Sequence, residues 1–276
     1  MQTLSRETQL IFEANRAVGE TTFSAETAGE ATRRCVVHER GPLRVRFPNA
    51  DPRVLEAVII NTAGGIAGGD SLAIDISAGA GAQLVVSTAA AEKIYRSMGS
   101  NARLTLKLRA GAGAHLSWLP QETIMFDRAR LSRRIDVDLA PEASLVLAEA
   151  LVFGRSAMGE AVEEGAVTDC WRVRRGGKLI FAETTRLTGA VSRRLSEPAV
   201  AKGARAIATL LVTPAHDGCI TEVRSLAQDF AGEAAISAWN GIAIARFCAP
   251  DGAALRHDLL SVLAALRISL PRLWLQ

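Results

Sequence analysis

Aromatic residues are scarce in this 276-residue chain, and cysteine motifs are missing. Phe, Trp and Tyr make up 5% of the residues, with Tyr95 the single tyrosine, so a core has to be built mainly from Ala, Val, Leu and Ile. The cysteines show no CxxC spacing, and the first residues hold no apolar stretch of signal-peptide length. These absences predict a protein of the reducing cytoplasm.

Long apolar runs and a strong charge of one sign are also lacking. No run approaches the roughly 20 residues that a membrane-spanning helix needs, so no membrane partner is expected. Lys and Arg number 32 against 29 Asp and Glu, a net charge of +3 that is too weak to predict nucleic-acid binding. The densest basic stretch, residues 128–134, is interpreted as a solvated turn between strands.

Catalytic signatures are absent as well. The chain has no GxSxG nucleophile turn, no GxxxxGK[ST] phosphate loop and no HExxH metal motif. Its four histidines are scattered, which disfavours an acid–base centre. The sequence therefore predicts a protein that is not an enzyme.

Three segments that begin at Ile74, Leu106 and Val137 share one pattern of strand, turn and strand. Their flanks alternate apolar and polar residues with a period of two, and Gly or Pro marks each turn. The equivalent alanines are Ala82, Ala114 and Ala143, at intervals of about 30 residues, which is typical of stacked repeats. No helical pattern separates the strands, so a parallel α/β fold is disfavoured.

Two hairpins are predicted at Gly176-Gly177 and Asn240-Gly241, since these pairs tolerate positive φ. Apolar residues at helical spacing predict helices over 221–232 and 251–266. The expected fold is mainly β, a β-helix-like stack of antiparallel or mixed strands, with antiparallel pairs in the majority and two C-terminal helices. We expect a single domain over 1–276, with a β body over about 8–213 and a smaller helix-plus-hairpin part over about 214–276.

A glycine-rich loop, Asn61–Asp70, follows the apolar run VLEAVII. A dinucleotide-binding glycine motif stands at the start of a helix, whereas a strand pattern follows here. The loop is therefore interpreted as a place where two backbone segments pack closely. Asp70 is then expected to accept hydrogen bonds from the loop amides.

Glu149 and Glu183 each interrupt an apolar strand pattern. A buried unpaired carboxylate is costly, so each should be exposed by the alternation, paired, or placed along a hydrated path. Arg155 is a candidate counter-ion for Glu149. Carboxylates along such a path would suit a divalent cation.

Two other functions are considered. The pairs Cys35-x-x-His38 and His216-x-x-Cys219 have the spacing of metal half-sites, and together they would form a tetrahedral metal store. A β-helical enzyme that cleaves polysaccharides is the other alternative, although the low aromatic content weighs against a sugar platform.

Six blocks, in order along the chain, resemble the UreD/UreH urease accessory family. They are HERGPLRVRFPN (His38–Asn49), NTAGGIAGGDSL (Asn61–Leu72), STAAAEKIYRS (Ser87–Ser97), LPQETIMFDRARL (Leu119–Leu131), EALVFGRSAMGE (Glu149–Glu160) and LPRLW (Leu270–Trp274). The resemblance extends from about residue 33 to the C-terminus.

This resemblance implies a non-enzymatic scaffold that links apo-urease to UreF and the GTPase UreG and passes nickel to urease. It implies no tightly bound cofactor, only transient Ni²⁺. The candidate residues for the nickel path are Asp70, Glu149, Glu183 and Glu92. The C-terminal helices and the LPRLW tail are expected to form partner-binding surface.

Overall fold

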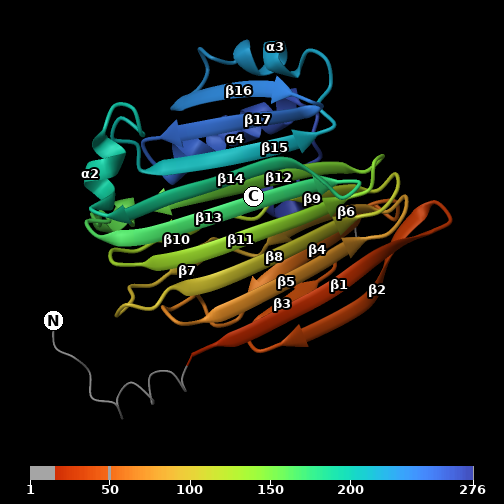
Figure 1. The fold of residues 1–276 in the computed structure, drawn as a ribbon, viewed down its shortest axis with the longest axis horizontal. Helices are drawn as coiled ribbons and strands as arrows, with labels where there is room; N and C mark the ends of the chain where they lie inside the picture. Colours follow the sequence, from red (N-terminus) through yellow and green to blue (C-terminus); the bar gives the residue numbers. More distant parts are fainter. Residues whose placement is uncertain (1–15, 49–50, 276) are drawn as a thin grey trace.

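The computed structural model describes residues 16–48 and 51–275, which form a β-solenoid of about four turns. Two sheets make up its two faces (Figure 1). The strands of the first sheet are β1 (Val18–Ala28), β2 (Ala31–Arg40), β5 (Ser71–Ala78), β8 (Ala102–Ala110), β11 (Arg130–Leu139), β13 (Gly165–Arg175) and β14 (Lys178–Gly189). They lie in the order β14-β13-β11-β8-β5-β1-β2.

The second sheet contains the remaining strands of the described chain. These are β3 (Leu43–Arg46), β4 (Leu55–Asn61), β6 (Gln83–Thr88), β7 (Glu92–Ile94), β9 (His115–Trp118), β10 (Thr123–Met125), β12 (Ser144–Phe153), β15 (Ala206–Thr213), β16 (Glu233–Trp239) and β17 (Ile242–Ala249). Their main order is β16-β17-β15-β12-β9-β6-β4-β3, and the short β10 pairs with both β12 and β7.

Parallel pairs join successive turns of the solenoid in both sheets. In the first sheet β1, β5, β8, β11 and β13 pair in parallel, as do β4, β6, β9 and β12 in the second. Antiparallel pairs lie toward the ends, such as β1–β2 and β15–β17. The expected majority of antiparallel pairs is therefore wrong, because each Gly-Ala turn leads from one sheet to the other and does not fold back within a sheet.

The predicted repeat is confirmed in three dimensions. Ala82, Ala114 and Ala143 are fully buried at the corner between the sheets. The amide of His115 donates to the Ala82 carbonyl and that of Ser144 to the Ala114 carbonyl, both at 2.8 Å. A side chain larger than alanine would not fit a corner packed this closely, which explains the recurrence of alanine.

The two predicted hairpins are also confirmed. β13 and β14 are joined at Gly176 and Gly177, and β16 and β17 at Asn240 and Gly241. All four turn residues have φ between 49° and 78°, the left-handed region that the residues of tight hairpin turns adopt.

Three α-helices lie in the described ranges. α4 (Gly252–Ala265) matches the prediction over 251–266, with the Asp251 side chain accepting from the Ala254 amide at 2.9 Å. The helix predicted over 221–232 is only α3 (Cys219–Arg224), followed by turns, and it begins after Gly218 and not at Thr221. α2 (Val191–Ser196) was not predicted, because six residues are too few for a periodic signal.

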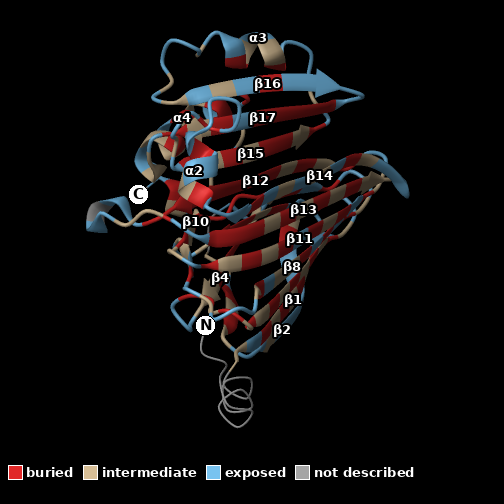
Figure 2. Cartoon of the chain, turned by 60° about the vertical axis from the view of Figure 1, so that its left-hand side comes forward, coloured by how far each residue is buried: buried red, intermediate tan, exposed pale blue. Residues whose placement is uncertain are grey.

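Hydrophobic side chains form one cluster between the sheets and a second on the outer face of the second sheet. Buried and exposed residues alternate along the strands (Figure 2). The second cluster contains α3 and α4 residues together with β12, β15 and β17 residues. The β16–β17 hairpin pairs with β15 at the edge of the second sheet. The part expected over about 214–276 therefore continues a sheet of the β body. The start expected at about residue 8 lies outside the described residues.

Candidate functional site

A buried ion-pair triad connects the two sheets across the interior. Arg133 lies on β11, where the inward positions Leu131, Ile135 and Val137 are apolar and only this one carries charge. Asp169 on β13 is its register partner in the first sheet, and Glu149 projects from β12 in the second. Arg133 is 2% exposed and both carboxylates are 6% exposed, so the triad is shielded from solvent.

Every carboxylate oxygen of the triad accepts a hydrogen bond. Arg133 donates from Nε to Asp169 Oδ1 at 3.0 Å and from Nη2 to Oδ2 at 2.5 Å, a bidentate fork. Its Nη1 donates to Glu149 Oε2, while Trp118 Nε1 donates to Glu149 Oε1 at 2.8 Å. Thr123 Oγ1 lies 3.5 Å from the same Nη1. Removal of Arg133 would leave two buried carboxylates without a counter-ion, whereas removal of either carboxylate would leave the other paired with the guanidinium.

Burial and the neighbouring Asp169 charge raise the pKa of Glu149 to about 7, although Arg133 and Trp118 act in the opposite direction. With both carboxylates ionised the triad carries a net charge of −1, because the guanidinium keeps its proton at any physiological pH. Protonation of Glu149 makes the triad neutral, so its negative charge grows as pH rises through about 7.

Two cavities share Arg133 and Glu149 as wall residues. The first, of about 380 Å³, lies between β14 and the strands β15, β17 and β16, and Asp169, Glu183, Arg246 and Cys248 line it. The second, of about 270 Å³, lies between the sheets on the other side, and Asn61, Glu92, Trp118 and Gln121 line it. The triad thus separates two hollow regions within one body.

Carboxylates also lie in the walls away from the triad. Glu183 on β14 pairs with Arg246 on β17, and its side chain is 22% exposed. In the second cavity Asn61 Nδ2 donates to both oxygens of Glu92, at 3.1 and 3.2 Å. Carboxylates on β12, β13, β14 and β7 therefore lie in the walls of the two cavities.

Burial raises the pKa of Glu92 to about 6, partly opposed by the hydrogen bond from Asn61. The folded chain then binds more protons than the unfolded chain between about pH 4.5 and 6, so this group lowers stability as pH rises through that window. We expect Glu92→Gln to raise the free energy of unfolding by about 1–2 kcal/mol at pH 8 and by nothing at pH 4. Urea unfolding at both pH values measures this. Glu142→Gln, at an exposed turn position, controls for the lost charge, and a gain equal at both pH values would contradict the prediction.

The expected site residues do not all lie together. Glu149, Glu183 and Glu92 line the two cavities, whereas Asp70 lines neither. Asp70 is buried and accepts from the amides of Ala17 and Ala67, each at 2.8 Å. It fastens the glycine loop to the start of β1, which is the backbone role that its position in the loop predicts.

Two local expectations are wrong. Arg155 does not neutralise Glu149 but donates to Glu160, at 2.7 and 3.2 Å, because it lies beyond the end of β12. Residues 128–134 are not simply a solvated turn, since β11 begins at Arg130 and Arg133 points inward. The signal for Arg133 is the alternation Leu131-x-Arg133-x-Ile135, which places it on the apolar face. The same kind of alternation, Val167-x-Asp169-x-Trp171, places Asp169 on the apolar face of β13.

The four residues of the metal-store alternative are far apart. Cys35 and His38 lie on β2 at one edge of the first sheet, while His216 and Cys219 lie at α3 beyond the opposite end of the solenoid (Figure 1). Within residues 16–48 and 51–275, no three His, Cys, Asp or Glu side chains group in a way that could hold a metal ion. The tetrahedral Cys₂His₂ set is therefore excluded.

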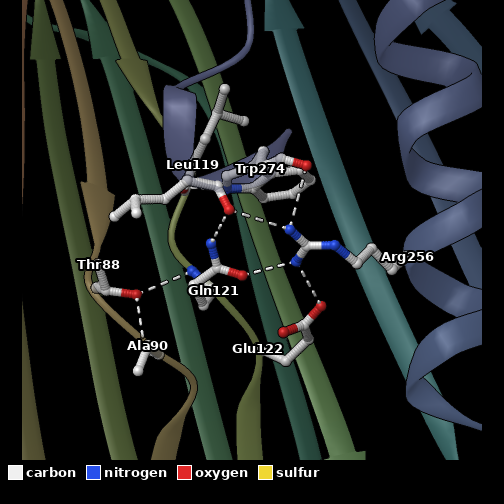
Figure 3. A network of polar contacts seen from close by, with 8 residues as sticks. Thr88, Ala90, Leu119, Gln121, Glu122, Arg256 and Trp274 are labelled. Atoms are coloured by element: carbon white, nitrogen blue, oxygen red, sulfur yellow. Dashed lines mark hydrogen bonds and ion pairs between the residues drawn. The ribbon is translucent and has the colours of Figure 1, made fainter. Parts of the chain in front are cut away.

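The LPRLW tail packs onto the protein through Pro271 and Trp274, while Arg272 remains exposed. Trp274 is 4% exposed, and its Nε1 donates to the Leu119 carbonyl at 2.9 Å. Arg256 on α4 donates from Nη1 to Gln121 Oε1 at 2.6 Å and to Glu122 at 3.2 Å (Figure 3). Its Nη2 donates to the carbonyls of Leu273 and Trp274. Because Gln121 lines the second cavity, this network connects the tail to the cavity wall.

None of the helices in the described ranges has the length and apolar character to span a lipid bilayer.

Comparison with known proteins assigns the family. The model of the UreD urease accessory protein family matches residues 17–275. The urease accessory protein UreD of Bradyrhizobium diazoefficiens is 54% identical over 268 residues, 97% of each chain. A UreD of Rhodopseudomonas palustris is 54% identical over 265 residues, 96% of this chain and 93% of its own, and another from that species is 53% identical over 276 residues, all of both chains. With a family model that covers nearly all of its described residues and full-length relatives above half identity, this chain belongs to the UreD family of urease accessory proteins.

Proposed function

We propose that this chain is a non-enzymatic scaffold that conducts nickel to urease, receiving the ion on the side of a UreF–UreG complex. The observation that carries the proposal is the pair of cavities that meet at the Arg133–Glu149 wall. Family membership supports a role in urease maturation, and the carboxylate-lined interior supports transport of a cation.

The order of groups along the cavities suits a cation in transit. Glu183 lines the first cavity, Glu149 and Asp169 lie at its inner end, and Glu92 with Asn61 lines the second. Oxygen ligands bind Ni²⁺ less tightly than thiolate or imidazole ligands do, and an ion that has to leave again needs weak, successive sites. Among the described residues no group of three or more His, Cys, Asp or Glu side chains could hold a metal ion. This agrees better with a protein that passes nickel on than with one that stores it.

Single carboxylate replacements test the path. We expect Glu149→Leu and Glu183→Leu each to lower the nickel loaded into urease about tenfold, which corresponds to about 1.4 kcal/mol of lost cation stabilisation. Co-purification of urease, UreF and UreG with each variant shows whether assembly persists, and the nickel content of the recovered urease measures the loading.

Asp136→Leu is the matched control, because Asp136 lies on the outward face of β11 and pairs with Arg134. Its urease should load normally. Normal loading in both cavity variants would overturn the path, and failure of urease, UreF and UreG to co-purify with the unchanged chain would overturn the scaffold role.

A further inference from the structure

A permanent positive charge lies in the middle of the proposed cation path. Arg133 contributes to the walls of both cavities, so an ion that moves from one to the other has to pass the guanidinium. Arginine does not lose its proton in proteins, so this charge cannot be removed by titration. A passage for Ni²⁺ is thus obstructed unless the guanidinium is held aside.

Each carboxylate oxygen of the triad already accepts a hydrogen bond in this arrangement. Both Asp169 oxygens accept from Arg133, and the Glu149 oxygens accept from Trp118 and Arg133. The positive charge of Nη1 lies against Glu149 Oε2, so it repels a cation that approaches this oxygen.

The three contacts of Arg133 are unequal. Asp169 holds Nε and Nη2 in a fork, from the paired position of the neighbouring strand. Glu149 is held through Nη1 alone, from the opposite sheet. The Thr123 hydroxyl, which is buried, lies 3.5 Å from that same Nη1, longer than an ordinary hydrogen bond. The Thr123 hydroxyl is therefore a second oxygen near Nη1, besides Glu149 Oε2.

We infer that Arg133 is the gate of the path: Nη1 exchanges Glu149 for the Thr123 hydroxyl, Asp169 retains the guanidinium, and the freed Glu149 carboxylate binds the passing Ni²⁺. Thr123 is the positioning residue, because its hydroxyl accepts from Nη1 after Nη1 has left Glu149. Without this acceptor a buried N–H would have no partner, which is costly in free energy. A divalent cation attracts the carboxylate twice as strongly as a monovalent one at equal distance, which favours displacement of the guanidinium by Ni²⁺ over displacement by Na⁺ or K⁺. This inference rests on the proposed nickel path.

A purely static triad that braces the two sheets is the competing explanation. It would use Arg133, Glu149 and Asp169 in the same way but would have no need of Thr123 as a second acceptor. The role of the Thr123 hydroxyl therefore distinguishes a gate from a brace.

Thr123→Val tests the gate, since valine has nearly the same shape and lacks the hydroxyl. In the assembled complex with urease, UreF and UreG, we expect nickel transfer about five- to tenfold slower than in the unchanged protein, with co-purification and thermal unfolding unaltered. Thr123→Ser, which keeps the hydroxyl, should transfer at the normal rate. Thr168→Val, at an outward-facing position of β13, is the matched control.

A double variant checks that Thr123 acts through Arg133. In an Arg133→Gln background the fixed charge is gone, so Thr123→Val should have no further effect on the transfer rate. Normal transfer in Thr123→Val, with slow transfer in Glu183→Leu, would overturn the gate and keep the path. Normal transfer in both would overturn the path itself.

Discussion

Replacement of Arg133 by methionine is expected to lower the free energy of unfolding by about 3–5 kcal/mol at pH 8. The substitution leaves Glu149 and Asp169 buried without a counter-ion, and each is only 6% exposed. At pH 5 the loss should be smaller, because burial raises the pKa of Glu149 to about 7, so this carboxyl is protonated there and needs no counter-ion. Urea unfolding at the two pH values measures the difference.

Two controls separate the triad from a general effect of lost charge. Arg134→Met removes the neighbouring arginine, whose side chain is 57% exposed and pairs with Asp136, and should cost less than about 1 kcal/mol. Adding Glu149→Gln and Asp169→Asn to Arg133→Met should recover most of the lost stability, since no buried charge remains. An Arg133→Met protein as stable as the parent at pH 8 would mean that the triad is not formed in solution.

Trp274→Ala is expected to lower the free energy of unfolding by about 3–5 kcal/mol. The indole is buried in the outer hydrophobic cluster, donates to the Leu119 carbonyl, and lies under the Arg256 guanidinium at 5.1 Å from its ring centre. Its removal also frees the segment that positions Arg256 and Gln121 (Figure 3). Chemical unfolding monitored by circular dichroism gives the magnitude.

Leu275→Ala is the matched control, because Leu275 is 70% exposed and its loss should change stability by less than about 0.5 kcal/mol. Equal stability of Trp274→Ala and the parent protein would show that the tail does not pack as described. Truncation at Leu270 would also remove the buried Trp274. Loss of partner binding in the truncated protein could therefore result from loss of stability.

Much of the candidate site could be predicted from local sequence. Glu149 and Glu183 stand out because each interrupts an apolar strand, and both line the first cavity. Asp70 was a candidate for the path because it lies in the glycine-loop block of the family resemblance, and its oxygens accept backbone amides, the other role expected of it. A carboxylate in a loop can bind a cation or accept hydrogen bonds from backbone amides. Only the positions of the Ala17 and Ala67 amides show which of the two roles Asp70 has.

Arg133 was missed for a different reason. Its basic neighbours at 128, 130 and 134 suggested a solvated turn, although the inward alternation from Leu131 to Leu139 was already present. An arginine on an apolar face is stable only with partners, and these come from positions 16 and 36 residues away. The sequence contains no local sign of such a pairing.

The sequence by itself determined the strand-turn-strand repeat, the two hairpin turns and the α4 cap, because alternation, positive-φ residues and a capping carboxylate act within a few residues. The tertiary structure alone decided that the repeats pair in parallel, that Trp274 is buried, and that Arg133, Glu149 and Asp169 meet. A Gly-Ala turn permits either a hairpin or a corner between sheets, and the choice depends on burial of the apolar faces of successive turns. The hydrophobic effect therefore selects the stack, and the stack brings the charges of three separate strands to one point.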